Sequence, residues 1–63
     1  MNEFQKLVNE NHNKQVNERI AYHQAQVEAW TENKERFGNA LPECDIKIAY
    51  NLEMIEIEKA TLG

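Results

Sequence analysis

A run of 36 residues without proline or glycine, from Asn2 to Phe37, restricts the fold of this 63-residue chain more than any other feature. Glutamate, glutamine, lysine, arginine and alanine dominate its second half, and these residues favour helix. Lys34 and Arg36 precede Gly38, which is typical of a helix end, because cations suit the negative end of the helix dipole and glycine commonly follows the last turn. The sequence therefore predicts one long helix over residues 2–37.

A second helix is predicted after a turn at residues 38–41. Pro42 fits a first helical turn because its missing N–H would have no partner there, and Glu43 and Asp45 suit the positive end of the dipole. This helix covers residues 42–61. Since a connection of about four residues joins antiparallel neighbours, the prediction is an all-α, two-helix antiparallel hairpin, with residues 1–63 as a single domain.

Residues spaced four and three apart form an apolar seam in the first helix, as in a coiled coil. They are Val16, Ile20, His23, Val27, Trp30, Lys34 and Phe37. Phe4, Leu7 and Val8 lie about 100° around the helix from this seam, at about 100° per residue. The intervening residues 9–14 include three asparagines, which are poor helix formers. We therefore expect a kink or break near residues 9–14, or a separate partner for the amino-terminal turns.

The second helix has two apolar faces. One is formed by Cys44, Ile48, Leu52, Ile55 and Leu62, and the nearly opposite one by Ile46, Tyr50, Met54 and Ile57. The first face is expected to cover the seam. The alternative is a strand over residues 46–58, because apolar and polar residues alternate through 46–54. Helix is preferred, since nothing divides the run into a hairpin and a solitary strand leaves its backbone unpaired.

A chain of this size has a small core and needs additional stabilisation. The single cysteine, Cys44, excludes an intramolecular disulfide, so we expect oligomerisation, with a dimer as the first choice. The net charge of −4, with six acids and five bases interspersed through residues 1–38, argues against nucleic-acid binding. We expect no membrane association and a cytoplasmic location, because neither a signal peptide nor an apolar span is recognisable.

No arrangement of residues predicts catalysis, a cofactor or a metal. His12 and His23 lie about 16 Å apart along one straight helix, too far to share an ion. Cys44 has no histidine nearby in the sequence and is expected to pack in the core. His23 interrupts the apolar seam, where a polar residue either sets the register and oligomeric state or is simply hydrogen-bonded.

The expected function is that of a small protein-interaction module: a homo-oligomeric helical regulator or inhibitor of a larger macromolecule, not an enzyme. The composition resembles that of small regulators encoded by phages or plasmids. Aromatic residues and methionine are typical of interface centres. The predicted interface residues are Ile46, Tyr50, Met54, Ile57 and His23. The alternative is a small-ligand binder, for example of nucleotides, with a pocket between protomers. Tyr22, His23, Arg19 or Trp30 would line that pocket.

Overall fold

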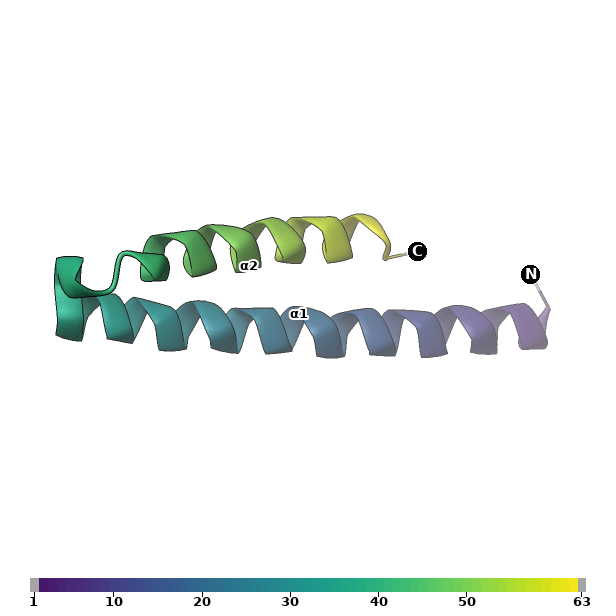
Figure 1. Cartoon of the computed structure of the whole chain (residues 1–63). Helices are drawn as coiled ribbons and strands as arrows, with labels where there is room; N and C mark the ends of the chain where they lie inside the picture. Colours follow the sequence, from purple (N-terminus) through teal and green to yellow (C-terminus); the bar gives the residue numbers. More distant parts are fainter. Residues whose placement is uncertain (1, 63) are drawn as a thin grey trace.

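The computed structural model describes residues 2–62, which form a helical hairpin. Helix α1 spans Glu3–Phe37, a short 3₁₀ segment η1 spans Gly38–Ala40, and helix α2 spans Glu43–Ala60. Figure 1 shows α2 folded back antiparallel along the carboxyl-terminal two thirds of α1. The predicted two-helix hairpin is confirmed. The alternative of a strand over 46–58 is wrong, because this segment lies within α2.

Helix α1 is continuous through residues 9–14 and runs straight in Figure 1, so the expected kink or break is wrong. Each asparagine costs only about 0.5 kcal/mol relative to alanine. This cost is too small to interrupt the helix, because residues 9–14 extend a helix that has already formed on both sides and need no new nucleation step. The helix begins at a defined cap, where the Asn2 side chain accepts a hydrogen bond of 2.7 Å from the Gln5 backbone N–H. The third expectation, a separate partner for the amino-terminal turns, stays a prediction.

The turn depends on Gly38, whose φ of 56° and ψ of −132° lie in a region that favours glycine. Its backbone N–H donates to the Lys34 carbonyl and closes the last turn of α1. The backbone N–H of Cys44 then donates to the Leu41 carbonyl at 3.2 Å. Leu41 and Pro42 connect η1 to α2, which begins at Glu43. The chain therefore reverses its direction within a few residues.

The core lies along the facing seams of α1 and α2. Val16, Ile20, Cys44 and Ile55 are the buried apolar residues. Val16, Ile20 and Ile55 form one cluster, and Val27 packs against it. Cys44 and Ile55 are therefore in the core as predicted, and Ile48 is half-buried. Trp30 is also half-buried.

Three expected core residues are instead exposed, and one of them, Leu62, lies beyond the end of α2. Leu52 is 50% exposed, and the residue that occupies the seam beside it is Asn51. Phe37 is largely exposed as well, because α1 ends there and the chain turns away at Gly38. The apolar core is therefore even smaller than the sequence predicted.

The two helices differ in length. Helix α1 has 35 residues and α2 has 18, so at about 1.5 Å per residue α1 is nearly twice as long. The end of α2 lies beside His12, which bonds the Thr61 carbonyl. Residues 3–11 therefore extend beyond α2 as an overhang, seen at the amino-terminal end of α1 in Figure 1. In the described part of the chain, neither helix is both long and apolar enough to cross a bilayer.

Candidate functional site

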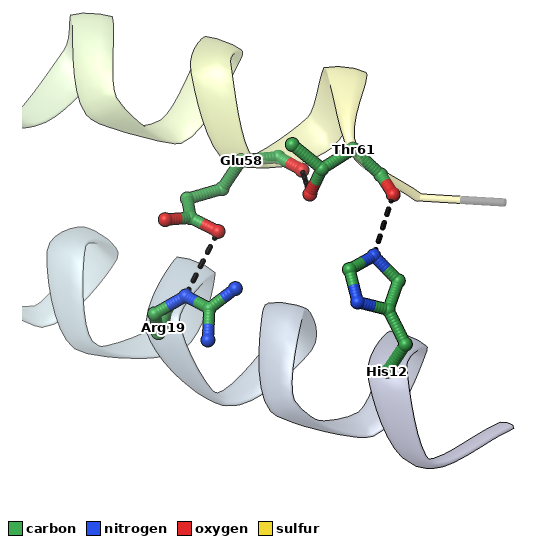
Figure 2. A network of polar contacts seen from close by, with 4 residues as sticks. All are labelled: His12, Arg19, Glu58 and Thr61. Atoms are coloured by element: carbon green, nitrogen blue, oxygen red, sulfur yellow. Dashed lines mark hydrogen bonds and ion pairs between the residues drawn. The ribbon is translucent and has the colours of Figure 1, made fainter. Parts of the chain in front are cut away.

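Polar side chains join the two helices at the open end of the hairpin (Figure 2). The Nε2 atom of His12 lies 2.8 Å from the Thr61 carbonyl oxygen, and because a carbonyl only accepts, the imidazole donates. Arg19 donates from Nε to the Glu58 carboxylate at 2.9 Å. The Glu58 side chain is only 13% exposed, so its charge needs this partner. These contacts fasten the last turn of α2 to the middle of α1.

A second polar contact lies inside the hairpin. The buried Asn51 accepts from His23 Nδ1 at 2.8 Å and donates from Nδ2 to the Lys47 carbonyl at 2.8 Å. The carbonyl can only accept, so the amide nitrogen of Asn51 must face Lys47 and its oxygen must face His23. His23 therefore carries a proton on Nδ1, and its Nε2 remains available as an acceptor in the neutral ring.

A groove beside this contact carries the aromatic side chains. We call it the aromatic groove, and its volume is about 270 Å³. It is lined by Tyr22, His23, Gln26, Trp30, Lys47, Tyr50 and Asn51. The rings of Tyr22 and His23 meet edge to face, with centroids 5.3 Å apart. Three of the four residues predicted to line a ligand pocket are thus together within one chain, whereas Arg19 pairs with Glu58 instead.

The opposite side of the hairpin has a different chemistry. A wider groove of about 500 Å³ is lined by Gln24, Val27, Glu28, Leu52, Ile55, Glu56 and Lys59. Its apolar floor is bordered by charged side chains and has no aromatic residue. The two long sides of the hairpin are therefore unlike: one is aromatic and the other is charged.

The outer face of α2 carries most of the predicted interface residues. Ile46 is 69% exposed and Tyr50 55% exposed, and Ile57 is also largely exposed. Met54 is half-buried beside them. His23 does not join this face, because it lies half-buried on α1 and bonds Asn51. We call Ile46, Tyr50 and Ile57 the outer stripe of α2.

The polar residues of the α2 seam were missed from the sequence. Asn51 and Glu58 continue the four-and-three spacing that starts at Cys44 and Ile48, and that spacing was the available signal. An antiparallel register sets Asn51 opposite His23 and Glu58 opposite Arg19. Matching polar residues across the two seams would have found His23 with Asn51, whereas Arg19 lies beside the α1 seam and gave no such signal for Glu58.

An exposed ion pair closes the loop end of the hairpin, where Lys34 Nζ lies 2.6 Å from Asp45 Oδ1. The hydrogen bond to Asp45 and the attraction of its charge raise the pKa of Lys34 above its usual value of 10.5. A raised pKa means that the pair stabilises the fold below about pH 10.5 and loses this effect as Lys34 deprotonates. Because both side chains are exposed, the gain at neutral pH is small.

Metal-binding groups do not gather in residues 2–62: the structure places no three His, Cys, Asp or Glu side chains so that they could hold an ion. Cys44 is a buried free thiol. The surfaces available for recognition include the two grooves, the outer stripe of α2 and the overhang. Comparisons with protein-family models, curated proteins and solved structures find no match for the chain.

Proposed function

We propose that the chain is a homo-oligomeric protein-interaction module that regulates or inhibits a larger macromolecule and has no catalytic activity of its own. The observation that carries this proposal is the outer stripe of α2, where Ile46, Tyr50 and Ile57 are exposed. Ile46 and Ile57 line neither groove between the two helices, and Tyr50 lies at the edge of the aromatic groove. Residues four and seven apart fall on one helix face, and Ile46, Tyr50 and Ile57 have this arrangement. Tyrosine is also enriched at binding hot spots.

The chemistry around the outer stripe indicates what kind of partner it would fit. Asp45, Glu53 and Glu56 are exposed on α2, and in this third of the chain acids outnumber bases. An amphipathic helix of this kind binds by laying its apolar residues into a groove of the partner. The proposed target is therefore a protein with an apolar groove bordered by basic residues. The proposed location is the cytoplasm, where the free thiol of Cys44 stays reduced.

The test compares three baits in an affinity capture from cell lysate. The baits are the intact protein, an Ile46→Ser/Ile57→Ser variant and a control Glu53→Ser/Glu56→Ser variant that changes two exposed residues of the same helix. We expect a partner that is retained by the intact protein and lost with the Ile46→Ser/Ile57→Ser bait. Loss with the control bait alone would assign recognition to charge, and identical capture by all three baits would contradict a role for the outer stripe.

The aromatic groove supports a second candidate function, the binding of a small planar ligand such as a nucleotide. Tyr22, Trp30 and Tyr50 offer aromatic surfaces, Lys47 offers a cation, and His23 Nε2 is an available acceptor. At about 270 Å³ the groove is smaller than the roughly 300–1,000 Å³ typical of ligand sites, which places this candidate second. A panel of mononucleotides should raise the melting temperature of the intact protein but not of Tyr50→Ala. Unchanged melting temperatures would exclude these ligands.

A further inference from the structure

One longitudinal stripe of α1 contains no acidic residue, although the helix contains six glutamates. We call it the acid-free stripe. Its central members are Phe4, Val8, Asn11, Gln15, Arg19, Tyr22, Gln26, Trp30, Asn33 and Phe37, and His12 and Ala29 lie at its two edges. At about 100° per residue they occupy about 100° of the helix circumference. Its single charged residue, Arg19, is already paired with Glu58. The stripe runs along the whole of α1, from the overhang to the loop end, on the side that borders the aromatic groove.

The members of the acid-free stripe repeat every eleven residues. The spacing of four, three and four occurs three times between Phe4 and Phe37. An eleven-residue repeat corresponds to about 3.67 residues per turn, so it stays on one side of a nearly straight helix over a long distance. The pattern therefore suits contact with another long helix along the full length of α1.

The acid-free stripe is also symmetric about its centre, near residues 20 and 21. Reversing the helix exchanges its members in five pairs whose residue numbers all sum to 41. The pairs are Phe4 with Phe37, Val8 with Asn33, Asn11 with Trp30, Gln15 with Gln26, and Arg19 with Tyr22. Two of the five pairs match in kind, phenylalanine with phenylalanine and glutamine with glutamine, and an antiparallel copy would present the same spacing opposite the stripe. A two-fold interface requires this self-complementarity.

The exposed area of the chain fits the requirement of a dimer. The chain exposes 4999 Å², whereas a compact monomer of 7.4 kDa is expected to expose about 4,200 Å². This excess of about 800 Å² reflects the long, thin shape of the hairpin, and it is as large as the area that one partner contributes to a standard interface. Phe4 lies on the overhang and is 75% exposed, because α2 is too short to cover it.

We propose that a second copy of this chain docks on the acid-free stripe in antiparallel orientation, with its overhang beside the loop end of the first copy. This proposal specifies the self-association within the proposed function and does not depend on the external target. An antiparallel pair covers each overhang with the Trp30 to Phe37 end of the partner. A parallel pair would instead place both overhangs together and bring Phe4 to the partner's Phe4.

Cysteine cross-linking tests the orientation in the intact chain. The variant Val8→Cys/Asn33→Cys, in a Cys44→Ala background, keeps every aromatic residue of the acid-free stripe. Treatment with a short bismaleimide should convert it mainly to covalent dimer at micromolar concentration. Within one chain the two cysteines lie about 38 Å apart along α1, so such a reagent cannot join them intramolecularly. The matched control is Val8→Cys alone, which should stay uncrosslinked because its cysteines lie at opposite ends of the dimer.

The remaining outcomes would overturn the proposal. Efficient cross-linking of Val8→Cys alone would show a parallel pair, and a monomer by sedimentation equilibrium with no cross-linking would show no pair. If circular dichroism shows that Val8→Cys/Asn33→Cys does not fold, the variant Gln15→Cys/Gln26→Cys in the same background tests the same register. If cross-linking fails while capture still depends on Ile46 and Ile57, the dimer is wrong and the target-binding function stands. If cross-linking succeeds while capture does not depend on Ile46 and Ile57, the dimer stands and the outer stripe is not the target-binding surface.

Discussion

At the scale of single residues, the hydrogen bond between His23 and Asn51 gives the contact between α1 and α2 a specific polar pair within an otherwise apolar seam. Asn51 is buried and its oxygen has His23 as its partner. Removing one partner leaves a buried polar group unsatisfied, so we expect His23→Leu or Asn51→Leu to lower the free energy of unfolding by about 1–3 kcal/mol. Replacing both with leucine should be nearly neutral or stabilising. Urea denaturation of the four proteins at one concentration measures this coupling; strictly additive effects would contradict it.

Leu52 and Ile55 form a second pair for comparison, because they lie three residues apart on α2 and differ in burial. Ile55 is 6% exposed and Leu52 50%. We expect Ile55→Ala to lower the free energy of unfolding by about 2–5 kcal/mol, through lost apolar transfer and a cavity. Leu52→Ala should cost about 1 kcal/mol, since half of its surface is already in water. Thermal or urea unfolding distinguishes them, and equal losses would mean that Leu52 is covered by another chain.

These residues also show where prediction from the sequence stops. Leu52 was assigned to the core as part of one apolar face of the second helix, whereas the structure places Asn51 in the seam. The polar residue is accommodated because its partner, His23, comes from the other helix. A rule that considers one helix at a time cannot find such a pair. For the same reason the bond between Arg19 and Glu58 was not predicted, although Cys44 and Ile55 were placed correctly.

At the scale of the elements, local signals predicted the helices well. Gly38 ends α1, Pro42 precedes α2, and the connection is short enough to make the helices antiparallel neighbours. The expected break near residues 9–14 was wrong because a small propensity cost does not interrupt a long cooperative helix. A change of helix direction therefore does not account for the exposure of Phe4, Leu7 and Val8. The remaining expectation is a separate partner for these residues.

The turn offers a prediction at this scale. Gly38 has a φ of 56°, and a Cβ added to it would meet nothing within 4 Å. The cost of Gly38→Ala is therefore backbone strain alone, and we expect it to lower the free energy of unfolding by about 1–3 kcal/mol. The control is Asn39→Ala, at an exposed neighbouring position that has no such restriction. A Gly38→Ala protein as stable as the control would show that the turn adopts another conformation.

At the scale of the whole molecule, the shape of the hairpin is what favours the proposed second copy. The Cα atoms extend over 54 × 14 × 10 Å, so the chain is long and thin, and few of its residues are far from solvent. The core contains only one layer of apolar contacts, between α1 and α2. A two-fold pair through the acid-free stripe would turn this layer into the interior of a four-helix arrangement.

Stability should therefore depend on protein concentration. For a dimer that unfolds to separate chains, each tenfold increase in concentration adds about 1.4 kcal/mol, and we expect the melting temperature to rise by about 5 °C. Gln15→Glu places a charge on the acid-free stripe, opposite the partner's Gln26, and should weaken this dependence. Gln24→Glu makes the same change at an exposed position outside the stripe and should keep the concentration dependence of the unaltered protein, although the like charge of Glu28 four residues on lowers its melting temperature slightly. Calorimetry of the three proteins at several concentrations measures both effects. A melting temperature independent of concentration would indicate a monomer, and equal effects of the two substitutions would place the interface on another face.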